Sequence, residues 1–331
     1  MKAFALLLVL VVLAAGGWFL YRHRLPAGGA DEAQEVSPLA TPPAAPLAPP
    51  APPAPTIPPE VLALLQQADA AWAAAGPTPA TSAAAPELSR LYTKALRALY
   101  NKPGCRERED QLINERLKPL GDTLFFSKQP FPADSQFAVH AVASGESPEA
   151  IGRKYGISRE LINRFRARDI NDSHIKVGES FKVLRMTGQT DPVKRGSLIH
   201  IDKGDFTLDL SMGGMFVRRY VCSHGAVQSP TPIGTTHLTN RVWHPDWTHP
   251  ATHKVIRYGA PEHLLGPIWL PFNGKELGQD GIGIHGYTGT DAKMGVKASN
   301  GCIRLVNEQA EELYQTICHP DRTPVIVEIV E

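Results

Sequence analysis

Two residues near the C-terminal end of the sequence are of the types that attack carbonyl groups. His285 follows a strand-like run, Gly281–Ile284, and Cys302 follows Gly301, where the backbone can turn sharply and expose the sulfur. A thiol reacts as the thiolate, and its pKa is about 8.5 unless a base or a positive charge lowers it. An imidazole can take the proton, and N–H groups around a glycine turn can hold an oxyanion. The pair therefore predicts nucleophilic catalysis.

The residues beside this pair are small, polar or cationic. They are Gly286 and Tyr287 after the histidine, Ser299 and Asn300 before the glycine turn, and Arg304 two positions beyond the cysteine. A positive charge favours a nearby thiolate. The constellation as a whole, more than the cysteine alone, predicts a cysteine-dependent active site.

Other interpretations of the cysteines remain open. A lone cysteine is most often a small buried hydrophobic residue, and a structural zinc site needs four ligands, often in closely spaced pairs. None of the four cysteines forms such a pair, which disfavours zinc. If Cys302 is a free nucleophile, Cys105, Cys222 and Cys318 remain, either as buried thiols or with a Cys222–Cys318 disulfide.

A histidine-rich segment, Arg241–His253, precedes the proposed pair. It holds three histidines and two tryptophans, namely Trp243, His244, Trp247, His249 and His253. The histidine spacing suggests a metal, but the prolines and tryptophans favour a lid or a substrate wall.

The motif His285-Gly286 followed by Ser299-x-Gly301-Cys302-Ile303-Arg304 resembles the signature of the YkuD-type L,D-transpeptidases, which cross-link bacterial peptidoglycan. A Thr-Pro-x-Gly element, Thr231–Gly234, also matches. The family usually has histidine at the position of Asn300. Asparagine can hydrogen-bond but cannot act as a base, and the resemblance gives that role to His285.

The resemblance implies a mechanism with no metal or organic cofactor. Cys302 attacks a stem peptide at its third residue, D-alanine leaves, and an amine of a neighbouring stem resolves the thioester into a 3-3 cross-link. N–H groups near Gly301 and Cys302 form the oxyanion hole, and the Gly286 carbonyl orients His285. Ser299 and Arg304 shape the loop and hold the donor's charge, and Tyr287 lines the acceptor channel.

Two other functions remain open at this point. With water as acceptor, the protein is an L,D-carboxypeptidase or a hydrolase of the same fold. Alternatively, it is a non-catalytic wall-binding protein, an interpretation that Asn300 supports.

Residues 194–331 are predicted to form a mostly β catalytic domain. Strands are expected at Ser197–Ile201, Phe206–Leu210, Met215–Cys222, Thr235–Val242 and Pro324–Val330, with a helix at Asn307–Ile317. The family fold is a mostly β sandwich with the cysteine near a mouth between its sheets.

Residues 136–186 read as strand, helix, helix and strand. The strands are predicted at Phe137–Val142 and within Ile175–Leu184, and Ser147 is a plausible N-cap. This order resembles a LysM domain, through motifs such as Ser144–Ser147 and Val177–Glu179. LysM modules bind glycans that contain N-acetylglucosamine, so the resemblance implies a wall-binding module.

The N-terminal part predicts an anchor and a spacer. Residues 1–24 contain an uncharged apolar run, Ala3–Leu20, which is just long enough to span a bilayer as a signal anchor or to serve as a signal peptide. Residues 25–59 form a Pro/Ala-rich linker, in which the eleven prolines from Pro38 to Pro59 favour an extended conformation. Residues 60–126 show apolar spacing typical of helices, and Gly121 is expected as the C-cap of the last one.

Composition agrees with this multidomain organisation. A chain of 331 residues can hold two or three domains, and its net charge of +1 argues against nucleic acid as a partner. The sequence thus predicts a membrane anchor, a helical region, a βααβ LysM domain and a mostly β catalytic domain. It also predicts a location at the extracytoplasmic face of the cell envelope, with peptidoglycan stem peptides and glycan strands as partners. It does not indicate an oligomeric state.

Overall fold

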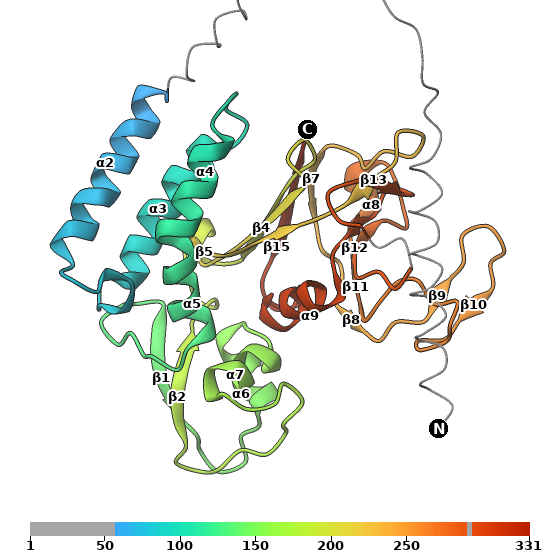
Figure 1. Cartoon of the computed structure of the whole chain (residues 1–331). Helices are drawn as coiled ribbons and strands as arrows, with labels where there is room; N and C mark the ends of the chain where they lie inside the picture. The colour runs from blue at the N-terminus through green and yellow to red at the C-terminus, as the bar shows by residue number, and fades with distance from the viewer. Residues whose placement is uncertain (1–56, 290–292) are drawn as a thin grey trace, which may run out of the picture. The chain divides into compact units, whose positions relative to one another are not determined.

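The computed structural model describes residues 57–289 and 293–331 (Figure 1). Contacts divide the chain into two units, Met1–Pro52, which lies outside these residues, and Pro53–Glu331. The predicted anchor therefore lies outside the described residues, as does nearly all of the linker. Within the described ranges, no helix combines the length and the apolar character needed to cross a bilayer.

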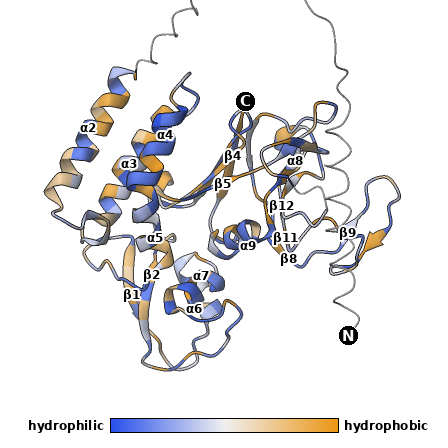
Figure 2. Cartoon of the chain, viewed as in Figure 1, coloured by the Kyte–Doolittle hydropathy of each residue, from blue (hydrophilic) through white to orange (hydrophobic). Residues whose placement is uncertain are grey.

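The N-terminal part of the described chain is helical, as its apolar spacing predicts. Its elements are α2 (Pro59–Ala74), α3 (Ala85–Leu99), α4 (Arg106–Leu112) and α5 (Lys118–Phe126), with a 3-10 turn at Pro79–Thr81 and a π-helical turn at Ile113–Leu117. Figure 2 shows hydrophobic and hydrophilic residues alternating along α3. The hydrophobic ones, such as Leu88 and Leu96, are buried, so the amphipathic pattern forms a core.

The expected C-cap at Gly121 is wrong, because α5 continues to Phe126. A Cβ atom on Gly121 would lie 2.6 Å from the carbonyl oxygen of Val217, on a strand that α5 packs against. Glycine is needed here for the close approach of helix and strand and not for ending the helix.

The next segment has the predicted strand–helix–helix–strand order. Its elements are β1 (Phe137–Ala141), α6 (Pro148–Tyr155), α7 (Arg159–Arg166) and β2 (Ser180–Leu184). β1 and β2 pair antiparallel. The Ser147 side chain accepts a hydrogen bond from the Ala150 N–H at 3.1 Å, which confirms it as the N-cap of α6.

The remaining residues form a β-rich part with two main sheets. The five-stranded sheet has the order β5-β4-β3-β15-β7, from Met215–Val221, Thr207–Met212, Ser197–Asp202, Val325–Val330 and Gly234–His237. The four-stranded sheet has the order β14-β12-β11-β8, from Ile303–Arg304, Gly283–His285, Ile268–Pro271 and Val242–Trp243. The smaller elements are β6 (His224–Gly225), β9 (Trp247–Thr248), β10 (Val255–Ile256), α8 (Gly274–Leu277), β13 (Lys297–Ser299), α9 (Asn307–Thr316) and a 3-10 turn at Pro192–Lys194.

One predicted strand is divided between the two sheets. The expected strand Thr235–Val242 ends at His237 in β7, and β8 begins at Val242. Between them, Leu238 bridges Phe272, which carries the chain from the larger sheet to the smaller one. The period-two pattern continues through this crossing, so the sequence alone does not reveal it.

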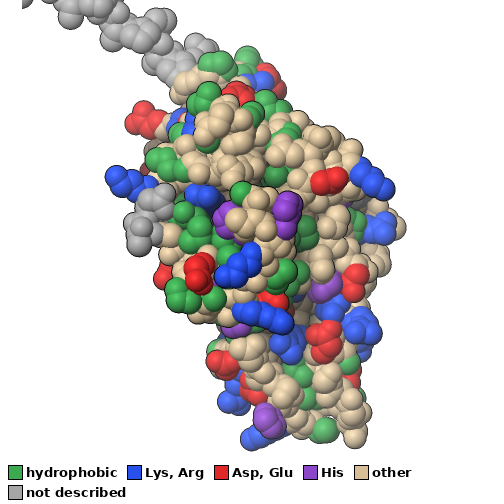
Figure 3. All heavy atoms as spheres, turned by 90° about the vertical axis from the view of Figure 1, so that its right-hand side faces the viewer, with side chains coloured by type: hydrophobic (Ala, Val, Ile, Leu, Met, Phe, Trp, Pro, Cys, Tyr) green, Lys and Arg blue, Asp and Glu red, His purple; other side chains and the backbone are tan. Residues whose placement is uncertain are grey.

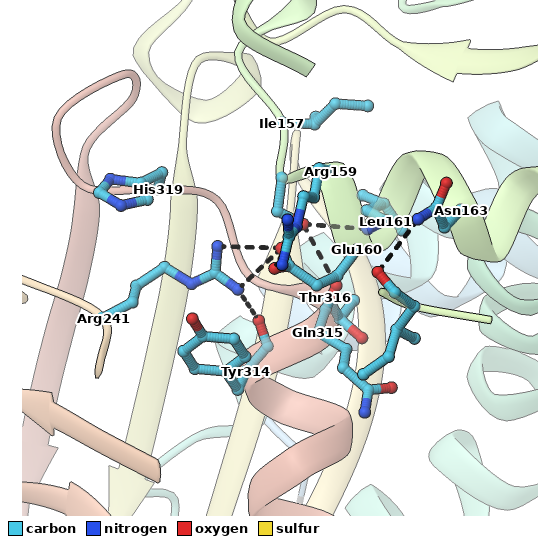
Figure 4. A network of polar contacts seen from close by, with 12 residues as sticks. Ile157, Arg159, Glu160, Leu161, Asn163, Arg241, Tyr314, Gln315, Thr316 and His319 are labelled. Atoms are coloured by element: carbon cyan, nitrogen blue, oxygen red, sulfur yellow. Dashed lines mark hydrogen bonds and ion pairs between the residues drawn. The ribbon is translucent and has the colours of Figure 1, made fainter. Parts of the chain in front are cut away.

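The βααβ unit is seated against the β-rich part by polar contacts (Figure 4). The buried Arg241 guanidinium lies 3.4 Å from the Glu160 carboxylate of α7 and also donates to the Tyr314 carbonyl of α9. The Arg164 guanidinium donates to the Gln315 side chain at 2.9 Å, and the Ser158 hydroxyl donates to the Gln315 carbonyl at 3.2 Å. α9 therefore holds the βααβ unit through its last turn.

Candidate active site

His285 and Cys302 are brought together by two neighbouring strands. β12, which ends at His285, pairs in parallel with β14, and the register matches Ile284 with Ile303 and His285 with Arg304. Cys302 directly precedes β14. Residues 17 positions apart in the sequence are thus adjacent across one strand pair.

Strand pairing brings the backbones of the two residues close together. Successive side chains alternate between faces, so Ile284 and Ile303 share the core face, where both are fully buried. His285 and Arg304 then share the opposite face, and Cys302 lies at the start of this strand pair, opposite Gly283. With strands about 4.8 Å apart and a rise of about 3.3 Å per residue, the Cα atoms of His285 and Cys302 are roughly 8 Å apart diagonally. The side chains can reach each other over such a separation.

His285 is buried, with 6% of its surface exposed, and a hydrogen bond to one ring nitrogen orients its side chain. Its Nδ1 atom hydrogen-bonds the carbonyl oxygen of Gly286. A carbonyl only accepts hydrogen bonds, so Nδ1 carries the proton and the neutral ring keeps its lone pair on Nε2. The pKa of His285 is lowered to about 4, chiefly by burial and also by the Arg304 charge, against the raising effect of the Gly286 and Leu265 carbonyls. The imidazole is therefore neutral at pH 7.

Cys302 is half-buried, and its thiol is protonated at rest. Burial raises the pKa of the thiol, while a hydrogen bond from the Gly283 backbone and the Arg304 charge both lower it. The sulfur also lies 3.9 Å from the carbonyl oxygen of Gly281. Both groups are therefore neutral, a thiol and an imidazole rather than a thiolate and an imidazolium.

The loop before the cysteine is fixed by a network of hydrogen bonds. The Ser299 hydroxyl donates to the Cys302 carbonyl and accepts from the Gly301 N–H at 3.2 Å. Gly301 adopts a φ of +102°, a region that residues with side chains rarely occupy. The Thr231 hydroxyl donates to the Gly301 carbonyl at 2.8 Å and accepts from the Gly225 N–H at 2.9 Å.

These contacts show which N–H groups near Cys302 already have a hydrogen-bond partner. The Gly301 N–H is already bonded to Ser299, whereas the Cys302 N–H donates to none of the residues that the structure describes. Thr231 was missed as a site residue. The match of Thr231–Gly234 to a family element was the signal that could have found it.

Arg304 and Tyr287 form a cationic and aromatic wall beside the pair. The guanidinium of Arg304 lies 4.0 Å from the centre of the Tyr287 ring. The side chain of Asn307, the first residue of α9, accepts from the Tyr287 N–H at 2.8 Å. No signal in the sequence indicated Asn307, because its role depends on the packing of α9 beside the loop.

Asn300 occupies the position where the sequence departs from the expected motif. Its side chain is exposed and makes no hydrogen bond with the described residues. The structure therefore gives it no part in orienting His285 or Cys302.

The histidine-rich segment forms an antiparallel hairpin, β9–β10, with aromatic contacts around it. Trp247 makes an edge contact with the ring of His263, which also hydrogen-bonds the Pro245 carbonyl at 2.8 Å. The Thr288 hydroxyl donates to the His263 carbonyl and so ties the hairpin to the loop after His285. Figure 3 shows the side of the molecule that carries β9 and β10, with histidines among hydrophobic and cationic side chains.

Neither a metal cluster nor a disulfide is present in the part of the chain that the structure describes. No three histidine, cysteine or acidic side chains there gather closely enough to hold a metal ion. Cys105, Cys222 and Cys318 are buried free thiols, so of the two alternatives for Cys222 and Cys318 the structure shows free thiols.

Comparisons with known proteins agree on the β-rich part. Residues 196–327 match the family model of the YkuD L,D-transpeptidase catalytic domain. The Bacillus subtilis protein YqjB, which carries the name of an L,D-transpeptidase, is 36% identical over 110 residues, covering 33% of this chain and 57% of YqjB. YkuD of Bacillus subtilis, named likewise, is 26% identical, covering 57% of this chain and 97% of YkuD.

Solved structures are matched more weakly. The catalytic domain of the Enterococcus faecium L,D-transpeptidase is 18% identical, covering 40% of this chain and 96% of that chain, with a TM-score of 0.31. That score is too low to inform the fold. The family model and the two bacillar relatives agree: residues 196–327 are similar to the YkuD family of L,D-transpeptidase catalytic domains, and the chain spans only 57% of the length of YqjB.

Proposed function

We propose that this protein is a peptidoglycan L,D-transpeptidase with Cys302 as nucleophile and His285 as general base. The observation that carries the proposal is the parallel pairing of β12 with β14, which brings Cys302 and His285 to neighbouring positions. There the His285 Nδ1 atom is held by the Gly286 carbonyl, and Cys302 follows a hydrogen-bonded glycine turn. A base oriented by a third group beside a nucleophile is the general arrangement of covalent acyl transfer.

The neutral state of the pair defines the first step. Nε2 of His285 takes the thiol proton as the sulfur bonds to the substrate carbonyl carbon, because neither group is charged beforehand. The carbonyl π electrons move to oxygen, and the Cys302 N–H, which has no other described partner, donates to this oxyanion. The imidazolium then gives its proton to the leaving D-alanine nitrogen as the C–N bond breaks, which leaves a thioester.

The second half of the reaction repeats these roles. An amine from a neighbouring stem attacks the thioester, His285 accepts its proton, and the C–S bond breaks as Cys302 recovers a proton. The product is a cross-link between two third-position residues. Arg304, half-buried beside the pair, supplies the positive charge that can hold the donor's carboxylate.

The rest of the chain supports a location at the cell envelope. The family acts on peptidoglycan stem peptides, which lie outside the cytoplasm. The strand–helix–helix–strand order of β1, α6, α7 and β2 fits a LysM module that binds glycan strands. The apolar run Ala3–Leu20 would hold the protein at the membrane, with the Pro/Ala-rich segment as a spacer.

The test is a reaction of the full chain with purified disaccharide-tetrapeptide fragments, analysed by mass spectrometry. We expect cross-linked dimers that have lost D-alanine, and a covalent adduct on Cys302 with a carbapenem. Cys302→Ala should reduce the rate by about 10⁴-fold or more. Cys105→Ala, which removes a buried thiol of the helical region, serves as the matched control and should leave the rate unchanged.

Each other outcome selects another function. Tripeptides without dimers would mean that water resolves the thioester, as in an L,D-carboxypeptidase. Dimers from the Cys302→Ala variant would refute the assignment, and neither product nor adduct from the parent chain would indicate a wall-binding scaffold.

A further inference from the structure

A cavity of about 750 Å³ lies between α3 and the five-stranded sheet, and neither His285 nor Cys302 lines it. Its walls come from four parts of the chain: α3, the segment that joins the βααβ unit to the β-rich part, residues of β3 and β15, and the end of β4 with the turn that follows it. Its volume is within the range of about 300–1,000 Å³ typical of small-molecule sites. The transpeptidase chemistry does not use it.

The floor of this cavity is apolar because the helices cover only part of the sheet. α3 and α5 pack on β5, at one edge, and leave β3 and β15 less covered on that face. Leu198 of β3 and Ile326 of β15 are only half-buried there, whereas their core-facing neighbours Ile199 and Val327 are fully buried. Val193, which is 56% exposed, extends the apolar lining at the rim.

The rim is cationic from two sides. Lys94 of α3 stands on one wall, and Lys194 and Arg195 of the joining segment also line the cavity. Within the described ranges, their charged groups form no hydrogen bond or ion pair, although Lys194 acts at longer range on the carboxylate of Asp134. Asp191, an exposed lining residue, is the nearby acid whose carboxylate already accepts from the Val193 N–H at 2.9 Å.

Two further arginines of the lining are already neutralised. Arg90 binds the Asp134 carboxylate at 2.7 and 2.8 Å, and Arg97 lies 3.3 Å from the Glu328 carboxylate. The unpaired positive charge is therefore confined to Lys94, Lys194 and Arg195. Three cations above an apolar floor complement a group with several acceptor oxygens and more than one negative charge on an aliphatic body.

We propose that this cavity binds a lipid phosphate, a phosphate monoester on an aliphatic chain, with the chain on Leu198 and Ile326 and the phosphate between Lys94, Lys194 and Arg195. The apolar floor excludes free phosphate as the preferred ligand, because half-buried Leu198 and Ile326 gain nothing from it. The site does not depend on the transpeptidase assignment.

Photolabelling of the full chain tests this proposal. The probe is decyl phosphate with a diazirine at the end of its chain, used below its micellar concentration. After irradiation and digestion, mass spectrometry should find the label concentrated in the peptides that contain Leu198 and Ile326. Excess decyl phosphate should remove the label, whereas decyltrimethylammonium and inorganic phosphate should not.

Matched variants localise the charge. The double variant Lys94→Gln, Arg195→Gln should reduce the labelling of these peptides about tenfold, since two charge-assisted contacts are lost. Lys128→Gln removes an exposed lysine outside the cavity and should leave the labelling unchanged. Label spread over the chain, equal competition by the cationic amphiphile or by inorganic phosphate, or an equal loss in Lys128→Gln would each overturn the proposal.

Discussion

The buried histidine of the proposed catalytic pair sets the pH range in which the thiol can be activated. A protonated imidazole cannot accept the Cys302 proton, and the pKa of His285 is lowered to about 4 by burial and by Arg304. We therefore expect the acid limb of the kcat/KM profile near pH 4 rather than near about 6.5, the value of an exposed histidine. Arg304→Gln removes one lowering influence and should move the limb upward. An acid limb that stays near pH 6.5 in the parent chain would contradict the neutral-pair description.

The lowered pKa of His285 also makes the stability of the protein depend on pH. Its folded-state pKa is below its unfolded value, so between about pH 6.5 and pH 4 the unfolded chain binds a proton that the folded chain does not. The stability contributed by the neutral ring is present above about pH 6.5 and is lost as the pH falls through about 4. Urea unfolding of the parent chain and of His285→Gln over this range should show a smaller pH dependence in the variant.

Asn300 tests how strictly the family motif must be kept. Because its side chain is exposed and has no described hydrogen-bond partner, Asn300→His should change stability by no more than about 0.5 kcal/mol and the rate by about twofold at most. Ser299→Ala is the contrasting variant, since it leaves the Cys302 carbonyl and the Gly301 N–H without a partner. Its kcat should fall about tenfold or more, at a stability cost of about 1–3 kcal/mol. A larger effect of Asn300→His than of Ser299→Ala in steady-state assays would reverse this ranking.

At the scale of elements, one buried ion pair is among the contacts that hold the βααβ unit against the β-rich part. The side chains of Arg241 and Glu160 are 3% and 11% exposed, so removing the arginine leaves a poorly solvated carboxylate. Arg241→Ala should destabilise the protein by about 3–5 kcal/mol in urea unfolding. The control is Arg257→Ala, whose partner Asp246 lies at 2.9 Å but in an exposed pair, and its cost should be at most about 1 kcal/mol. Equal costs for the two variants would show that the buried pair contributes no more than a surface one.

At the scale of elements it is also clear which features of the fold the sequence alone does not predict. Period and turn signals predicted the strands β3, β4, β5 and β15 and the order of the βααβ unit, because burial on one face repeats regularly along each element. The prediction of Gly121 as a helix cap was wrong. Glycine is needed there because the helix packs closely against Val217, on a strand almost a hundred residues further along the chain. The parallel pairing of β12 with β14 is equally non-local, which is why the motif named His285 and Cys302 but not their geometry.

At the scale of the whole molecule, one buried amine makes the free energy of unfolding depend on pH above neutrality. Lys182 of β2 is 1% exposed, and its described partners are the Thr123 carbonyl at 3.1 Å and the rings of Phe131 and Phe165. Burial lowers its pKa to about 7. Between about pH 7 and about 10 the unfolded chain holds a proton that the folded chain lacks, so stability rises with pH there.

The prediction is tested by comparing the stability of the protein at two pH values. Urea unfolding should give a parent chain roughly 2 kcal/mol more stable at pH 9 than at pH 7, from about 1.4 kcal/mol per pH unit less the partial titration near pH 7. Lys182→Met should lose this increment and be more stable than the parent at pH 7, because the site no longer desolvates an amine. If the variant keeps the full increment, other groups are responsible for it.

The contacts at the two ends of α9 have a mechanical consequence. Its first residue, Asn307, accepts a hydrogen bond from the Tyr287 N–H, two residues after His285, and its last turn, at Tyr314 and Gln315, contacts Arg241 and the βααβ unit. The helix between these two contacts is about 12 Å long and stiff. A force on the βααβ unit would therefore be transmitted along α9 to the loop that follows His285.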